Sequence, residues 1–228
     1  LRMLSAFSRD VATSGRAAID VKVTGLADEP LVDGRMTIEN GGLVLRRPRF
    51  AVSDLQGTVT FARDALRLGE ITANANGGTL RIAGGIQYPN FTLSGGSISI
   101  TGRGLALEVP DDLRSEIDAD LQLNVSDTSP TITGSVTLLR GSYRKPVSLT
   151  AQLLNTNTQP AVPTAQAGPD WFNHVLLNVD VKTAEGVVVD KNYARLDMSA
   201  NLRIVGTLTE PVPTGRVAIE EGGDVFVR

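Results

Sequence analysis

The side chains that could support catalysis are few in this sequence. There is no cysteine and only one histidine, His174, which excludes thiolate nucleophiles, Cys-ligated metal sites and nearly every histidine-based dyad. Ser142 and Ser148 could act as hydrolase nucleophiles, but neither lies in the Gly-x-Ser-x-Gly turn that exposes such a serine. We therefore predict that the protein is not an enzyme, with no catalytic residue, no cofactor and no metal site.

Three clusters of charge have simpler explanations than a binding site. The acidic pairs Asp111-Asp112 and Glu220-Glu221 could hold calcium or act as acid and base. Adjacent residues on a strand point to opposite faces, so solvated turn charges are the simpler interpretation. The run Arg46-Arg47-Pro48-Arg49 could contact phosphate or anionic headgroups, but beside a proline it is more simply a guard against edge-to-edge aggregation.

The overall charge argues against nucleic acid as a partner. The 228 residues include 22 Lys plus Arg against 25 Asp plus Glu, for a net charge of -3, so there is no general cationic field. No stretch approaches the roughly 18 to 20 apolar residues that cross a bilayer, and the first 30 residues lack the order of a signal peptide. Because the chain begins with Leu1, we expect a piece of a longer protein whose targeting signals lie outside it.

The elements that position these residues are predicted to be almost entirely β-strands. Val, Ile and Thr recur in short runs of period two that are separated by Gly, Asn and Asp. The clearest alternation covers Ala194–Ile204, Ile117–Val125 and Val175–Val181, each with one apolar and one polar face. Shorter strands are predicted at Ile19–Val23, Arg35–Glu39, Leu43–Leu45, Gly57–Phe61, Ala65–Leu68, Glu70–Asn74, Thr79–Ala83, Phe91–Leu93, Ser97–Thr101, Ala106–Val109, Ser135–Leu139, Val147–Leu153, Gly186–Val189, Arg216–Glu220 and Asp224–Val227.

The predicted fold is one long, twisted antiparallel sheet. Asn40-Gly41-Gly42, Asn76-Gly77-Gly78 and Glu221-Gly222-Gly223 are typical of hairpin turns, which favour a meander. Leu1, Leu4, Phe7 and Val11 recur at helical spacing and predict a short amphipathic helix. The predicted organisation is a helix and lead-in over residues 1–14, a β-region over 15–154, a mobile loop over 155–173 that splits the sheet, and a continuation of the sheet over 174–228.

A spaced repeat is the strongest pattern in the chain. The spacing Pro-x3-Gly-x6-Gly occurs at Pro30, Gly34 and Gly41, and again in two further copies, at Pro130, Gly134 and Gly141 and at Pro211, Gly215 and Gly222. We predict that the proline ends one strand, the first glycine allows a bend or bulge, five residues form the next strand and the last glycine makes a hairpin turn.

Two strings carry a family resemblance. They are GTLTEPVPTGRVAIEEGG, which follows the predicted strand Ala194–Ile204, and VPDDLRSEIDADLQLNVSDTSPTITGSVTLLRGSY. They resemble the C-terminal region of the TamB translocation and assembly module family, which is similar to the AsmA-like, bridge-like lipid transfer proteins. The resemblance covers roughly residues 15–228 and is weakest across 155–170. It implies a β-taco, a long sheet folded lengthwise around an apolar trough.

The resemblance also implies a place and partners. Family members are anchored in the inner membrane of diderm bacteria, span the periplasm, and are associated with protein secretion and outer-membrane biogenesis through an Omp85-type, TamA-like partner. The family is also regarded as a bridge for phospholipid transport. Unfolded outer-membrane β-strands are a further expected partner, because an unpaired sheet edge can template an incoming strand.

The residues themselves suggest how such a sheet would hold lipid. Every predicted strand has an apolar face, yet one short helix is the only predicted cover, so the sheet must curl, pair with another sheet or meet an apolar ligand. About 16 strands spaced by about 4.8 Å would form a trough on the order of 75 Å long. The predicted groove-lining residues are Ile117, Leu121, Leu123, Val125, Val175, Leu177, Val179, Val181, Leu196, Met198, Leu202 and Ile204. The alternatives are a closed, dry β-sandwich and a purely structural β-solenoid or sandwich of a secreted or surface protein.

Overall fold

The computed structural model describes most of the chain. The described residues are 11–26, 30–45, 49–89, 92–108, 113–126, 129–143, 173–184, 188–191, 194–219 and 224–225. They are strands and short connections, with no α-helix in these ranges. None of the segments described here forms a helix with the length and apolar character that a membrane span requires.

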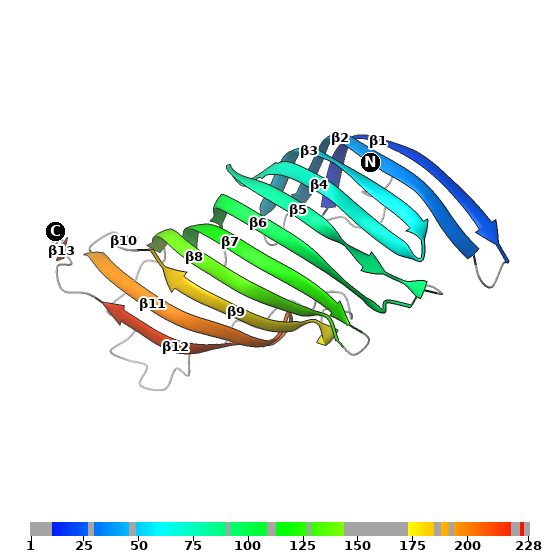
Figure 1. The fold of residues 1–228 in the computed structure, drawn as a ribbon. Coiled ribbons are helices and arrows are strands. Elements are labelled where there is room, and N and C mark those ends of the chain that lie inside the picture. Colours follow the sequence, from blue (N-terminus) through cyan, green and yellow to red (C-terminus); the bar gives the residue numbers. More distant parts are fainter. Residues whose placement is uncertain are drawn as a thin grey trace.

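Thirteen strands form a single sheet, shown in Figure 1. Eleven of them follow one another across it in the order β1-β2-β3-β4-β5-β6-β7-β8-β10-β11-β12, and β9 and β13 pair off this path. The strands are β1 (Val11–Gly25), β2 (Pro30–Leu45), β3 (Phe50–Arg63), β4 (Ala65–Ala75), β5 (Gly78–Gln87), β6 (Gly95–Leu107), β7 (Leu113–Ser126), β8 (Thr131–Tyr143), β9 (Leu176–Thr183), β10 (Val188–Lys191), β11 (Ala194–Thr207), β12 (Pro211–Ile219) and β13 (Asp224–Val225).

The prediction of a purely antiparallel meander is right for β1 to β8 and wrong after it. Consecutive strands from β1 to β8 pair antiparallel, whereas β9 and β10 both pair parallel with β8 and antiparallel with β11. β9 and β10 therefore occupy successive parts of one position between β8 and β11. The sheet is continuous there, and residues 155–172 of the predicted mobile loop lie outside the described residues.

The two faces of the sheet differ in polarity along its whole width. Residues that pair in register share a face, so rows of partners can be followed from strand to strand. One row crosses from β1 to β12 without a polar side chain: Ile19, Met36, Val59, Leu68, Gly84, Ile98, Leu123, Ile132, Leu177, Gly206 and Pro211. We call the face that carries this row the apolar face, and its opposite the polar face.

The strands from β1 to β8 are bent by β-bulges. The register shifts in the β1–β2, β2–β3, β3–β4, β4–β5, β6–β7 and β7–β8 ladders, toward the end of the strands that carries the β4–β5 turn. A bulge bends its strand and increases the local twist. Because these bulges lie in neighbouring strands, they bend the sheet along the direction of its strands, and Figure 1 shows strands that arch along their length.

The repeated Pro-x3-Gly spacing places a glycine where strands approach closely. Gly34, Gly134 and Gly215 have φ of 152°, 128° and 135°. A Cβ built on any of them would overlap the backbone carbonyl oxygen of the neighbouring strand, well inside the 3.0 Å that real Cβ atoms keep. Only glycine fits such a backbone. Pro30 and Pro211 begin β2 and β12, and Pro130 stands just before β8.

The last glycine of the repeat does not make the predicted hairpin turn. Gly41 lies inside β2, at a bulge beside Asn40 (φ 47°), and Gly141 lies inside β8. In the third copy Gly222, with the turn predicted at Glu221-Gly222-Gly223, lies outside the described residues. The turn predicted at Asn76-Gly77-Gly78 is confirmed and joins β4 to β5.

Other element boundaries also differ from the prediction. Residues 11–14 belong to β1 rather than to a helix, and the rest of the predicted helix, 1–10, lies outside the described residues. Glu70–Asn74 and Ala65–Leu68 are one strand, β4. The described part of Phe91–Leu93 is not a strand, and Val147–Leu153 lies outside the described residues. The structure describes thirteen strands, and the prediction of about sixteen was for the whole chain.

A small buried core sits beside the β4–β5 turn, on the apolar face. Val52, Ala73, Ala75 and Leu105 are buried together there, with Phe50 and Ile117 among the partly buried residues that pack against them.

Asn76, in the β4–β5 turn, fastens this end of the sheet. Its Oδ1 accepts from the N–H of Ala51 (2.7 Å) and its Nδ2 donates to the carbonyl of Ala106 (2.6 Å). Since Ala51 is in β3 and Ala106 in β6, the side chain joins the two strands that flank the shorter hairpin.

Candidate apolar binding face

The apolar face is built from three further rows besides the one defined above. One row runs through Ile71, Ile82, Ile100, Leu121, Gly134, Val179, Ile204 and Pro213. The next runs through Ala73, Leu80, Gly102, Ala119, Val136, Val181, Leu202 and Gly215. A third runs through Val21, Gly34, Phe61, Leu66, Ile86, Gly96 and Val125. No side chain in these rows is polar.

Ten of the twelve predicted lining residues lie on this face, from three strands. β7 supplies Ile117, Leu121, Leu123 and Val125; β9 supplies Leu177, Val179 and Val181; β11 supplies Met198, Leu202 and Ile204. Of the other two, Val175 directly precedes β9, and Leu196 pairs through its backbone with Val189. The pairing therefore brings the predicted residues onto one continuous surface.

Most of these side chains keep contact with solvent. Val175 and Val179 are buried, at 3% and 7% exposed, and the other nine whose side chains are described are half-buried. Across the described residues only nine hydrophobic side chains are buried. All the described strands belong to one sheet, so they supply no second layer to cover the face, as a closed sandwich would require.

The apolar face is most open at its two ends. Ile19 and Val23 on β1 are 66% and 63% exposed, and Val217 on β12 is 52% exposed. These are the outermost strands of the path across the sheet, where the face has a neighbouring strand on one side only. The surface is thus a band with an open end at β1 and another at β12.

The sequence prediction missed the half of this surface formed by β1 to β6. Met36, Val59 and Leu68 belong to the row that crosses the whole sheet. Their strands contain bulges and glycines such as Gly84, which interrupt the simple alternation of apolar and polar residues. The spacing of apolar residues on each side of a bulge was the available signal, but it becomes readable only when the partner strand is known.

The polar face holds its charges in scattered, exposed pairs. Arg103 Nη2 lies 2.7 Å from Asp120 Oδ1, and Arg81 Nη1 lies 3.0 Å from Glu70 Oε1. The hydrogen bond that Arg103 donates to Asp120 is the main reason that the pKa of Arg103 is raised. Within the described ranges no three His, Asp or Glu side chains converge as metal ligands would. Exposed pairs of this kind contribute little to stability, and they form no polar pocket.

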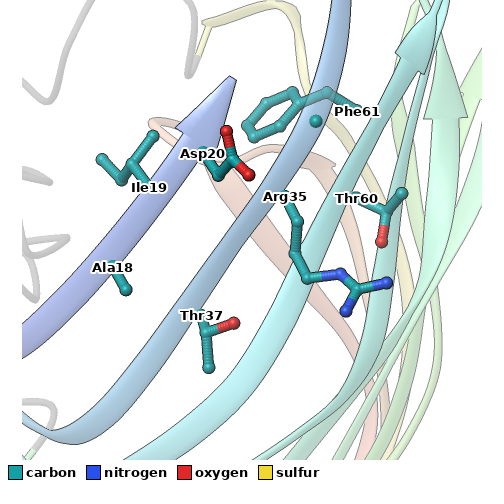
Figure 2. A pocket seen from close by; sticks show the side chains of 8 residues that line it. Ala18, Ile19, Asp20, Arg35, Thr37, Thr60 and Phe61 are labelled. Carbon is teal, nitrogen blue, oxygen red and sulfur yellow. The ribbon is translucent and has the colours of Figure 1, made fainter. Parts of the chain in front are cut away.

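A shallow depression of about 520 Å³ lies over β1 to β3. Its lining includes Asp20, Arg35 and Phe61, and Figure 2 shows the guanidinium of Arg35 pointing away from Asp20. One carboxylate and one guanidinium leave the depression without net charge. It therefore gives no indication of a specific ligand beside the much larger apolar face.

A comparison with known protein families identifies the family of this chain. The family model described as TamB C-terminal domain matches residues 67–227. The chain belongs to the TamB family. The TamB match starts within β4 and includes every predicted lining residue, while β1 to β3 precede it. Neither a curated protein nor a solved structure matches the chain. Membership of the TamB family indicates a protein of the bacterial envelope.

Proposed function

We propose that this TamB family chain carries phospholipid along its apolar face, between the inner and outer membranes, without catalysis. The observation that carries the proposal is the apolar row that crosses from β1 to β12, with exposed apolar side chains at both ends. The chain would act in the periplasm as part of a protein anchored in the inner membrane. Its family membership supports a place in the envelope.

The dimensions of the face suit acyl chains. Eleven strand positions spaced by about 4.8 Å span about 48 Å, shorter than the trough of about 75 Å predicted from the sequence. Along β7, the eight steps from Ile117 to Val125 cover about 26 Å at about 3.3 Å each. The acyl chains of one leaflet extend about 15 Å, half of a hydrocarbon core of about 30 Å. A tail therefore fits within the face while its headgroup stays in water.

Curvature supports a groove rather than a flat surface. The bulges bend six ladders in the same part of the sheet, and the half-burial of uncovered side chains is what a concave face produces. We infer a sheet curled lengthwise into a taco-like trough. Each tail methylene that leaves water there gains about 0.8 kcal/mol, and successive apolar rows give similar gains, so a lipid can slide without a specific pocket.

A second role, the assembly of outer-membrane β-strands, is favoured by the edges of the sheet. Among the described strands, β1 and β12 each pair on one side only. β1 contains no proline, so an amphipathic strand can add to its free edge through backbone hydrogen bonds, with its apolar side chains continuing the apolar face. In this role we propose an Omp85-type, TamA-like outer-membrane protein as the partner that receives the strand.

The lipid proposal is tested by moving a charge across the sheet. Leu123→Asp places a carboxylate on the apolar face, and Gln122→Asp places the same group on the polar face one residue away. Met198→Asp and Ser199→Asp form a second matched pair. We expect native mass spectrometry to find more than one phospholipid per chain in the parent and both polar-face variants, and a clear loss in both apolar-face variants.

Circular dichroism separates lipid loss from unfolding. A lipid groove tolerates Leu123→Asp with its strand signal intact, whereas a dry core unfolds. Photo-crosslinkers placed at positions 123 and 122 provide a second readout, since only the first should label lipid. A folded parent chain that carries no lipid and gives no crosslink from position 123 would refute lipid carriage.

A further inference from the structure

β9, like the short β10 that follows it, enters the sheet differently from the other described strands. It lies between β8 and β11, parallel to the first and antiparallel to the second. β8 and β11 therefore run antiparallel to each other, with one strand between them. Residues 144–175 connect the end of β8 to the start of β9.

β9 continues patterns that already exist on both of its neighbours. On the apolar face the rows are Ile132 with Leu177 and Gly206, Gly134 with Val179 and Ile204, and Val136 with Val181 and Leu202. On the polar face Asp180 pairs between Ser135 and Arg203. The two neighbouring strands thus present matched edges to any strand that alternates apolar and polar residues.

A small set of side-chain contacts selects the strand in this position. Val179 is 7% exposed beside Gly134, which has no side chain to fill that space. Arg203 Nε donates to Asn178 Oδ1 at 2.7 Å and lies 3.9 Å from Asp180 Oδ1. The occupant therefore needs a mid-sized apolar residue over Gly134 and hydrogen-bond acceptors on the polar face that reach Arg203.

The sequence before β9 is long enough for β9 to leave the sheet while β8 stays paired with β7 and β11 with β12. A return along the 13 residues of β8 needs about 43 Å at about 3.3 Å per residue. The connection over residues 144–175 can reach about 105 Å at about 3.3 Å per residue. β10 pairs with β11 at four positions and with β8 at two, so it holds β8 and β11 one strand apart beyond the end of β9.

We propose that the gap between β8 and β11 is a strand-binding slot, occupied here by the chain's own β9, which accepts an amphipathic β-strand of an unfolded client protein. The client strand runs parallel to β8, places alternate apolar residues on the apolar face, and offers an Asn- or Asp-type acceptor to Arg203. This inference extends the strand-assembly part of the proposed function. Failure of this inference can be distinguished from failure of the proposed function, because addition of a strand to an outer edge of the sheet does not require β9 to leave.

Competition with β9 sets the conditions for client entry. A tethered strand acts at an effective concentration of about millimolar, so a free peptide displaces it poorly. A chain whose own β9 is weakened presents the slot more often, and its apparent affinity for a peptide rises in proportion. β9 in this view is an autoinhibitory strand that excludes weak or dilute clients.

The test uses a synthetic peptide with the sequence of residues 173–184 and three forms of the chain. Val179→Asp places a charge at the buried position of β9, and Lys182→Asp places it on the exposed polar face of the same strand. We expect fluorescence anisotropy to show one peptide bound per Val179→Asp chain, at least about tenfold tighter than to the parent or to Lys182→Asp. The peptide carrying the same Val179→Asp change should not bind.

Equal binding to all three chains would indicate addition to an outer edge and would overturn the slot. So would a folded Val179→Asp chain that binds no peptide. If Val179→Asp does not fold, hydrogen exchange on the parent chain decides the question. The slot requires β9 amides to exchange at least about tenfold faster than β8 amides bonded to β7 and β11 amides bonded to β12. Exchange of all three strands at one rate would refute the proposal.

Discussion

Replacement of Gly134 by alanine tests whether the repeated glycines allow the strands to approach closely. Two separate effects oppose the methyl group. The backbone at φ 128° lies in a region that costs a non-glycine residue about 1–3 kcal/mol. The new Cβ would also overlap the carbonyl oxygen of Asp120 and come within 3.0 Å of the Cα of Leu121. β7 cannot retreat easily, since β6 pairs on its other side, so overpacking adds about 1–3 kcal/mol.

We expect Gly134→Ala to lower the free energy of unfolding by about 4 kcal/mol, the middle of these two ranges together. For a chain of this size the melting temperature should fall by about 8–16 °C, at about 2–4 °C per kcal/mol. Gly77→Ala is the matched control: Gly77 also has positive φ (87°), but a Cβ there meets nothing within 4 Å. Gly77→Ala should lower the free energy of unfolding by only about 1–2 kcal/mol.

Urea unfolding followed by far-UV circular dichroism measures both variants, and comparison of the slopes shows whether the midpoints can be compared. The loss of unfolding free energy in Gly215→Ala should lie between those of the other two variants, because β12 is an outer strand and can move away from β11. If the midpoint of Gly134→Ala falls no further than that of Gly77→Ala, close approach of the strands is not the reason for the glycine.

Three other perturbations have defined outcomes. Asn76→Gly keeps the positive φ but removes the side-chain hydrogen bonds to β3 and β6, so urea unfolding should show a loss of about 1–3 kcal/mol; no loss would mean that the hairpin tip does not join those strands. Arg81→Ala breaks an exposed pair with Glu70 and should change the unfolding free energy by less than about 1 kcal/mol; a larger loss would contradict the description of the polar face. The pKa of Tyr88 is raised by burial and then by Asp64 and Asp33. Stability from Tyr88 is therefore complete below its unfolded pKa of about 10 and is lost as pH rises above it, so Tyr88→Phe should lose less stability between pH 9 and pH 11 than the parent chain, and equal losses would refute that role.

The amphipathic character of the strands could be predicted because it is local. In β11 the alternation from Ala194 to Ile204 fixes which residues share a face, whatever strand lies beside it. The same reasoning placed Leu123 and Met198 correctly on one surface. The hairpin turn at Asn76-Gly77-Gly78 was predictable as well, since residues with positive φ join two strands whose alternation is intact.

The errors arose where the structure depends on a distant partner. The residue types of Asn40-Gly41-Gly42 are typical of a turn. β2 nevertheless continues through them as a bulge, because β1 and β3 pair with it on both sides. The parallel entry of β9 depends on the edges of β8 and β11, which lie far from it in sequence. No periodicity within residues 176–183 distinguishes a parallel from an antiparallel neighbour.

The two outer strands of the sheet differ in what a further strand would meet. Pro211 and Pro213 both lie in β12 and have no N–H group. In a strand that pairs on one side only, prolines lie where the missing N–H would face the free edge. β1 contains no proline and presents fifteen residues of backbone. Among the strands that the structure describes, two copies that met through β1 would leave only the edges of β12 facing outward. We therefore expect association of the isolated chain to stop at pairs, which protects an open apolar sheet from growth into fibrils.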